Sequence, residues 1–74
     1  MTYHVVPDKQ NGHFRWAVKR SGNQRVSSHH NSKQRAKRKA KKLARSNNVS
    51  SVIYHRRDGQ AHDSWSNPDY NGRR

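Results

Sequence analysis

Eight lysine and arginine residues crowd into the fourteen positions from 33 to 46, and no acidic residue lies among them. Lysine and arginine side chains donate hydrogen bonds and carry positive charge, so the chemistry open to such a cluster is the binding of anions. A run of like charges also repels itself, which destabilises the segment that carries it. The cluster therefore raises the question of which partner neutralises it.

The same segment has the periodicity of an amphipathic helix over residues 32–46. Its apolar side chains recur at i, i+4, i+7 and i+8, which places them on one face. These side chains are Ala36, Ala40, Leu43 and Ala44. Ser32 is the expected N-cap, with Asn31 as the alternative. Asn47 and Asn48 are the expected stop, because asparagine tolerates the left-handed conformation that ends many helices.

The basic side chains occupy the rest of the helix surface. The central patch of the predicted binding face comprises Arg35, Arg38, Lys39, Lys42 and Arg45. Its extension comprises Lys33, Lys37 and Lys41. Five like-charged pairs lie at i,i+4, and at about 0.2–0.5 kcal/mol each they cost roughly 1–2.5 kcal/mol at low salt. Alternating glutamate and lysine would keep a surface equally soluble, so we interpret the helix as the contact face for a polyanion.

The whole chain is strongly basic. Its 74 residues contain 17 lysines and arginines but only four acidic residues, all of them aspartate, for a formal net charge of +13. Such a field attracts polyanions over a Debye length of roughly 8 Å. Nucleic acid is the expected partner, with an acidic protein or a membrane surface as alternatives. The helix disfavours the membrane, because its apolar side lacks the bulky residues that an interfacial helix buries in lipid.

Alternating patterns predict strands on both sides of the helix. Asn11-Gly12 and Asp58-Gly59 are the residue pairs that tight hairpin turns favour, and Pro7 is expected to end the first strand or to lie at an edge. The expected strands cover about residues 2–7, 13–20, 24–30, 49–55 and 60–65. The fold class is therefore α+β, a small antiparallel sheet packed against one basic helix in the order β-β-β-α-β-β. We expect one domain over residues 1–65 and a flexible basic tail over 66–74.

The core available to this domain is small. Its expected members are Tyr3, Val5, Phe14, Trp16, Val18, Val26, Ala36, Ala40, Leu43, Ala44, Val52 and Tyr54. Trp65 could either cap this core or, like Tyr70, stack on an unpaired nucleic-acid base. No apolar run reaches seven residues, so neither a membrane-spanning helix nor a secretory segment is expected. We therefore expect a cytoplasmic protein, associated with the nucleoid if it binds DNA.

Further basic pairs lie beside the predicted turns and at the end of the chain. Lys19-Arg20 and Arg56-Arg57 are either ordinary hairpin ends or additional phosphate clamps. Arg73 and Arg74 are expected to be a mobile auxiliary contact in the tail.

Catalysis and metal binding find little support in the sequence. The chain lacks cysteine and glutamate, and no serine lies in a nucleophile elbow. Its histidines form no i,i+4 helical pair, and the adjacent His29 and His30 would point to opposite sides of a strand. We therefore expect no enzyme activity, no metal site, no cofactor and no small-molecule substrate.

Several short motifs occur together in one order: "YHVVP", "WAVKRSG", a serine-capped helix containing "LAR", and "YHRRDG". Over residues 3–65 the chain thereby resembles a family of small bacterial and phage proteins, domain-of-unknown-function family 2188. The resemblance implies the same strand and helix layout and brings no established activity. Helices of that family mix acidic and basic residues, whereas this helix has no acidic residue, so the resemblance implies that polyanion binding is a specialisation of this chain and not a property of the family.

The function predicted from these residues is nucleic-acid binding, with double-stranded DNA favoured over RNA, mainly through phosphate contacts. Because phosphate contacts convey no sequence information, weak or shape-based selectivity is expected. Two alternatives stay open. The chain could be an inhibitor-like phage or bacterial module that grips an acidic protein surface, or it could bind structured RNA.

Overall fold

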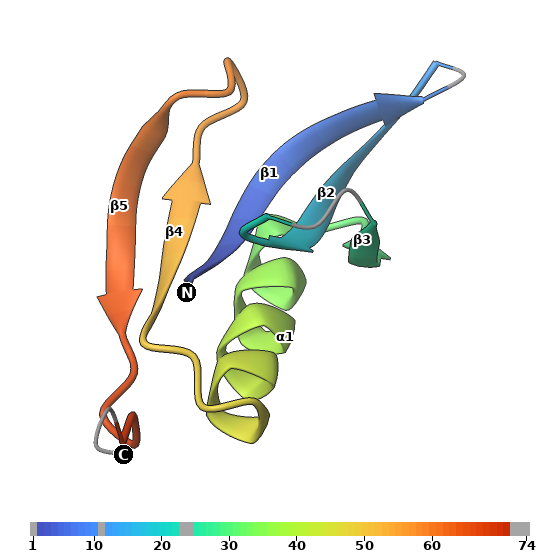
Figure 1. Cartoon of the computed structure of the whole chain (residues 1–74). Helices are drawn as coiled ribbons and strands as arrows, with labels where there is room; N and C mark the ends of the chain where they lie inside the picture. Colours follow the sequence, from blue (N-terminus) through green and yellow to red (C-terminus); the bar gives the residue numbers. More distant parts are fainter. Residues whose placement is uncertain (1, 11, 23–24, 72–74) are drawn as a thin grey trace.

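In the computed structural model of this protein, residues 2–10, 12–22 and 25–71 are described. Five strands and one helix follow one another along the chain (Figure 1). They are β1 (Thr2–Gln10), β2 (His13–Arg20), β3 (Val26–His30), α1 (Lys33–Ser46), β4 (Ser51–His55) and β5 (Ala61–Ser66). The predicted α+β order β-β-β-α-β-β is confirmed.

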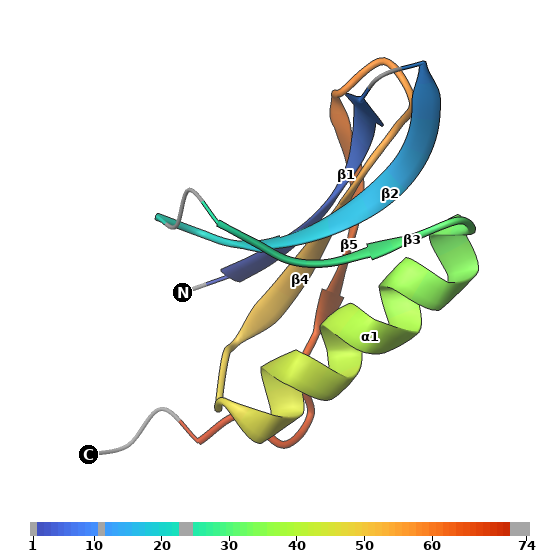
Figure 2. The same cartoon turned by 90° about the vertical axis from the view of Figure 1, so that its right-hand side faces the viewer.

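The strands form one sheet in the order β3-β2-β1-β4-β5, and α1 covers one face of it (Figure 2). The β1–β2, β2–β3 and β4–β5 pairs are antiparallel. The central pair, β1 with β4, is parallel, with Tyr3 opposite Val52. This pairing arises because α1 carries the chain across the sheet from β3 at one edge to the far side of β1. The sheet is thus mostly antiparallel, around one parallel pair.

Strand β1 continues through Pro7, which lies opposite Trp16 of β2. The pairing of β1 with β4 ends two residues earlier, at Val5. Because Pro7 lies beyond that pairing, its missing amide hydrogen removes no bond to β4. The hairpin turns contain the expected glycines, with positive φ angles of 80° at Gly12 and 93° at Gly59. Asn11 lies outside the described residues.

Small residues let α1 lie close against the sheet. Ala36, Ala40 and Ala44 are fully buried at 0% exposure. They pack on alternate residues of the strands, which bury their larger side chains on the same face. Most of the expected core is confirmed. Phe14 and Leu43 are half-buried and pack against it, whereas Val26 is half-buried outside the core cluster. The core also includes residues that the sequence patterns missed: Ala17 and Val49.

Both ends of α1 have the caps that the sequence predicts. The Ser32 hydroxyl accepts a hydrogen bond from the Arg35 amide at 3.1 Å. At the other end Asn48 adopts a left-handed φ of 52°, and the Val49 amide donates to the Ala44 carbonyl at 2.8 Å. This is the Schellman arrangement, in which a residue with positive φ lets the chain bond back to the last helical turn.

The residues after β5 lie against this end of the helix. Buried Asn67 donates from its side chain to the carbonyls of Ala44 at 3.2 Å and Val49 at 2.9 Å. Asn48 and Asn71 exchange two further hydrogen bonds. The part of the expected tail that the structure describes is thus hydrogen-bonded to the helix end. No helix among the described residues is long and apolar enough to cross a membrane.

Candidate nucleic-acid interface

The outer face of α1 carries a row of exposed cations. Arg35, Arg38 and Lys42 are all exposed, on the side of the helix opposite the buried alanines. Within the described part of the chain, none of the three has a carboxylate within salt-bridge distance. We call Arg35, Arg38 and Lys42 the outer row. Its positive charge faces solvent and is balanced by no described carboxylate.

A second row of cations runs along the flank of α1 and lies over aromatic rings of the sheet. The Nζ atom of Lys33 is 4.9 Å from the centroid of Trp16, a residue of β2. Lys37 Nζ is 4.6 Å from the Tyr54 ring of β4, and Lys41 Nζ is 5.6 Å from the Trp65 ring of β5. Each distance is within the range of a cation–π interaction. We call Lys33, Lys37 and Lys41 the ring-held row.

Arg45 continues the ring-held row by one further turn but is also paired with an acid. Its guanidinium lies 5.4 Å from the Trp65 centroid, so two cations share this ring. Its Nε atom is 3.4 Å from a carboxylate oxygen of Asp69. Trp65 itself is half-buried and packs against the core. It therefore caps the core, as one of the two sequence interpretations predicts.

The contacts with aromatic rings compensate the like-charge repulsion on one flank of α1 but not on its outer face. Three of the five i,i+4 pairs join consecutive members of the series Lys33, Lys37, Lys41 and Arg45. A partly exposed cation–π contact contributes about 0.5–1 kcal/mol. Repulsion within one i,i+4 pair costs only about 0.2–0.5 kcal/mol. The aromatic contacts therefore offset the repulsion along the flank, whereas Arg38 and Lys42 repel each other with no compensating ring among the described residues.

Lys33 is further tied to the edge strand. Its ammonium donates to Nε2 of His62 in β5 at 2.8 Å. Burial, followed by the charge of Lys37, lowers the pKa of Lys33 from its ordinary value, while Asp63 acts in the opposite direction. The ring-held row thereby connects the helix to three strands of the sheet.

Lys39 lies on the other flank of α1 and is half-buried. It influences His30 at the end of β3, whose Nε2 is 2.8 Å from the Ser28 hydroxyl. Burial first, and then the charges of Lys39, His29 and Arg35, lower the pKa of His30. The central patch predicted from the sequence is thus divided. Three of its members form the outer row, Lys39 faces β3, and Arg45 is paired with Asp69.

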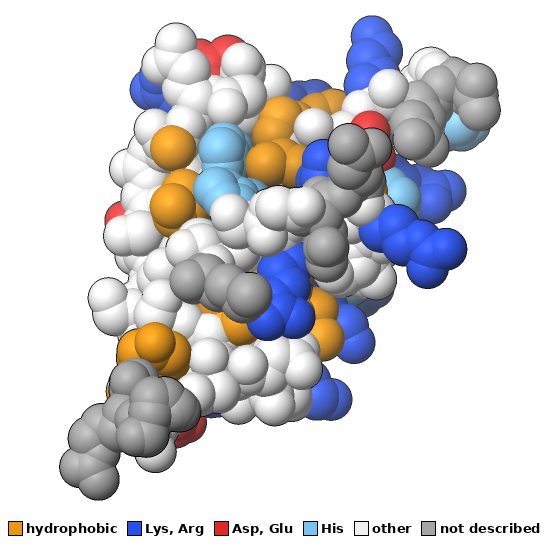
Figure 3. Space-filling model, viewed as in Figure 1, with side chains coloured by type: hydrophobic (Ala, Val, Ile, Leu, Met, Phe, Trp, Pro, Cys, Tyr) orange, Lys and Arg blue, Asp and Glu red, His pale blue; other side chains and the backbone are white. Residues whose placement is uncertain are grey.

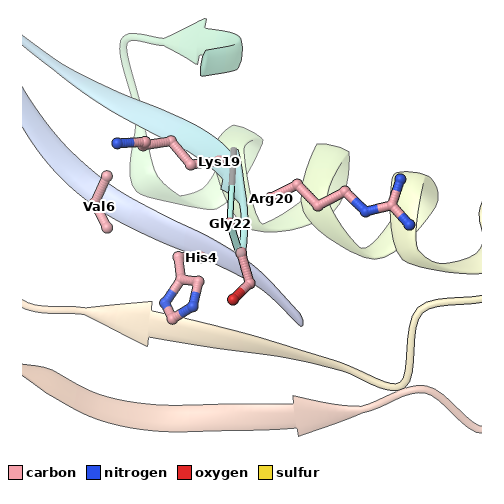
Figure 4. A pocket seen from close by; sticks show the side chains of 6 residues that line it. His4, Val6, Lys19, Arg20 and Gly22 are labelled. Atoms are coloured by element: carbon pink, nitrogen blue, oxygen red, sulfur yellow. The ribbon is translucent and has the colours of Figure 1, made fainter. Parts of the chain in front are cut away.

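The structure places Lys19 and Arg20 on opposite faces of the sheet. Arg20 lies on the helix side, with its guanidinium 6.0 Å from the Tyr3 ring. Lys19 pairs in register with His4 on the other face. Both residues help to line a shallow hollow of about 230 Å³, but their side chains point in opposite directions (Figure 4). They therefore do not form one clamp beside the helix.

The arginines of the β4–β5 turn are engaged within the protein. Arg56 donates to the Gln60 side chain at 2.8 Å and lies 3.5 Å from Asp58. The guanidinium of Arg57 lies 4.4 Å from the centroid of Phe14. This turn lies at the end of the sheet remote from the C-terminus of α1 (Figure 2). Arg73 and Arg74, the predicted auxiliary contact, lie outside the described residues.

The sheet face opposite α1 differs in chemistry from the helix. Histidine side chains lie among hydrophobic ones near its centre, and lysines and arginines gather along one margin (Figure 3). His4 of β1 and His55 of β4 approach to 2.9 Å between Nδ1 and Nε2. His55 Nδ1 donates to the Gly59 carbonyl at 3.0 Å, so its Nε2 accepts from His4 when both rings are neutral. This pair joins the two parallel strands.

The described residues offer little for stacking nucleic-acid bases or for binding a metal ion. The rings of Trp16, Tyr54 and Trp65 have cations of the chain itself over them. Tyr70 is the large hydrophobic side chain most open to solvent in the described regions, at 46% exposure. No group of three or more potential metal ligands occurs in the part of the chain that the structure describes.

A comparison with protein families matches residues 3–67 to a family described as "uncharacterized protein conserved in bacteria", DUF2188. The chain belongs to this family. The match covers the helix and the sheet except for Thr2, so the fold described above is that of a DUF2188 protein. No curated protein and no solved structure was found to match the chain.

The contacts between cations and rings are the feature of this DUF2188 protein that sequence reasoning missed. Lys33, Lys37, Lys41 and Arg45 recur every fourth residue beside the alanine stripe, which is a visible signal of a shared flank. The strand aromatics are equally visible in the sequence. The sequence does not show that these cations lie over these rings, because that arrangement depends on the position of α1 across the sheet.

Proposed function

We propose that this DUF2188 protein binds nucleic acid, with duplex DNA as its preferred form, through phosphate contacts made by the outer face of α1. The observation that carries the proposal is the outer row of exposed cations without a nearby described carboxylate. Uncompensated charge of this kind destabilises the free protein, and a polyanion removes the repulsion on contact.

The shape of the outer row supports a duplex. At 1.5 Å per residue, the seven steps from Arg35 to Lys42 span about 10 Å along a straight helix. Duplex DNA carries one charge per roughly 1.7 Å of its axis, so several phosphates lie within reach of this row. Single-stranded ligands are bound largely by stacking their bases on open aromatic faces. The rings of Trp16, Tyr54 and Trp65 have cations over them and do not offer such faces.

A salt titration tests the proposal. We expect the full chain to bind a fluorescently labelled DNA duplex more tightly than a single strand of the same sequence. With about six phosphate contacts, the slope of log K against log salt is near −5. The measurement is fluorescence anisotropy between about 50 and 200 mM salt, with an RNA duplex as a third ligand.

The comparison of the three ligands distinguishes the proposed function from its alternatives. A slope nearer −1, or no binding to any of the three at low salt, contradicts the proposal. Preference for the RNA duplex instead favours the structured-RNA alternative. If no nucleic acid binds, capture of an acidic protein from nuclease-treated lysate becomes the informative experiment.

A further inference from the structure

We infer that the cations of α1 have two separate roles: the outer row contacts nucleic acid, and the ring-held row holds the helix to the sheet. The inference rests on the proposed function and deepens it, because it assigns the contact to particular residues. It also differs from the expectation from sequence, in which Lys33, Lys37 and Lys41 extend the binding patch.

The ring-held lysines already have partners in the free protein. Lys37 and Lys41 are half-buried, with their ammonium groups 4.6 and 5.6 Å from the centroids of Tyr54 and Trp65. A phosphate that drew either lysine outward would separate it from its ring. The new contact would then replace an existing one, so it would add little to the free energy of binding.

The outer row has the opposite energetics. Arg38 and Lys42 are exposed, and no described carboxylate or ring lies within contact distance of either. Within α1 they repel each other at i,i+4, and each also faces like charges at i±3. A phosphate placed between them gains two attractions and removes that repulsion. Affinity for a polyanion is therefore concentrated on this row.

Two double variants that remove the same amount of charge separate these roles. Arg38→Gln with Lys42→Gln removes two positive charges from the outer row. Lys37→Gln with Lys41→Gln removes two from the ring-held row at the same i,i+4 spacing. The single changes Lys41→Gln and Lys42→Gln form a milder pair at adjacent positions, suited to the case in which a double variant does not fold.

We expect the outer-row double variant to make the salt slope less steep by about 2 and to weaken duplex binding roughly 50-fold near 0.1 M salt. Its melting temperature should not fall. The ring-held double variant should keep its slope and most of its affinity, while its melting temperature falls because both ring contacts are lost. The single variants should show the same contrast, with a slope change of about 1 for Lys42→Gln.

The outcomes distinguish this inference from the proposed function. If the unchanged chain binds no nucleic acid, the proposed function fails and the assignment fails with it. If the unchanged chain binds a duplex but both double variants lose slope and affinity equally, only the division into two rows is overturned. A larger loss in the ring-held variant, measured on folded protein, overturns it as well.

Discussion

At the scale of single residues, Asn67 closes the end of α1. It is 7% exposed, and its side-chain amide donates to the carbonyls of Ala44 and Val49. Its side-chain oxygen accepts from the Asp69 amide at 2.9 Å, and its backbone amide donates to Ser50 at 2.9 Å. One asparagine thus satisfies backbone groups at a helix end, where the last carbonyls have no partner within the helix.

We expect Asn67→Ala to lower the free energy of unfolding by about 1–3 kcal/mol, because buried carbonyls lose their donor. Asn67→Asp should cost at least as much, since a carboxylate cannot donate these bonds. Urea denaturation measures both changes. The control is Ser66→Ala, an exposed change at the preceding position, expected to stay within about 0.5 kcal/mol. Equal effects of the Asn67 and Ser66 changes would show that the side-chain bonds contribute nothing.

At the scale of elements, the packing of α1 on the sheet depends on small residues beneath the helix and on rings beside it. The three buried alanines bring the helix axis close to the strands. That short separation is what allows lysines on the flank to reach the rings of β2, β4 and β5. The aliphatic stem of a lysine can pack along an apolar surface while its ammonium lies over a ring. The helix therefore uses cations where other helices use larger apolar residues.

We expect the double change Arg38→Glu with Lys42→Glu to raise the melting temperature by several degrees while abolishing nucleic-acid binding. Each new carboxylate would lie at i±3 from remaining cations, and a gain of about 1 kcal/mol shifts the melting temperature of a domain this small by roughly 4–8 °C. Thermal unfolding followed by circular dichroism checks the first part, and anisotropy checks the second.

The matched control for that change is Lys37→Glu with Lys41→Glu, which alters the net charge equally but removes two ring contacts. We expect its melting temperature to stay below that of the outer-row change, because the lost ring contacts offset the relief of repulsion along the flank. A lower melting temperature for the outer-row change would mean that repulsion on the outer face does not destabilise the helix, and the central argument for a polyanion partner would be lost.

At the scale of the whole molecule, acid affects histidines on both faces of the sheet. The face opposite α1 carries the hydrogen-bonded pair His4 and His55, and the helix side carries His30, which pairs in register with Trp16. Burial, followed by the charges of His55 and Lys19, lowers the pKa of His4 below 6.5. His30, at the end of β3, also has its pKa lowered, with burial as the largest cause.

These shifts predict the direction of the dependence on pH. A histidine whose pKa is lower in the folded state than in the unfolded state binds fewer protons when folded. The free energy of unfolding should therefore be highest above about pH 6.5 and should fall as the pH drops through 6.5 toward the lower folded-state pKa. Urea denaturation at pH 7.5 and 5.5 measures the loss.

The variant His4→Gln should make this pH dependence less steep, because it removes one of the shifted groups. His13→Gln is the matched control, since it removes an exposed imidazole that has no side-chain hydrogen bond to any described residue. If the two variants have the same pH profile as the unchanged chain, then the contacts of His4 do not contribute to the loss of stability in acid.

The match to DUF2188 covers residues 3–67 and leaves the binding partner to be argued from the surface. Local signals were enough to predict the helix, its N-cap at Ser32 and its end at Asn47 and Asn48, because capping and amphipathicity are local properties. The same holds for the glycine turns at Gly12 and Gly59. Local patterns also identified which side of the helix is charged.

These local patterns do not predict contacts between residues that are distant in the sequence. An alternating strand pattern does not state which strand is the neighbour, so the parallel pairing of β1 with β4 follows only from the path of α1 across the sheet. Ala17 and Val49 were missed because burial by neighbouring strands and by a helix end leaves no periodic signal.

The sequence by itself determined that this chain is a basic α+β protein with an acid-free amphipathic helix, because charge and periodicity depend only on the order of the residues. Only the tertiary structure decided that Lys33, Lys37 and Lys41 lie over rings while Arg35, Arg38 and Lys42 face solvent. The physical reason is that electrostatic compensation depends on distance in space, and the rings lie 17 to 24 positions away along the chain, on three different strands.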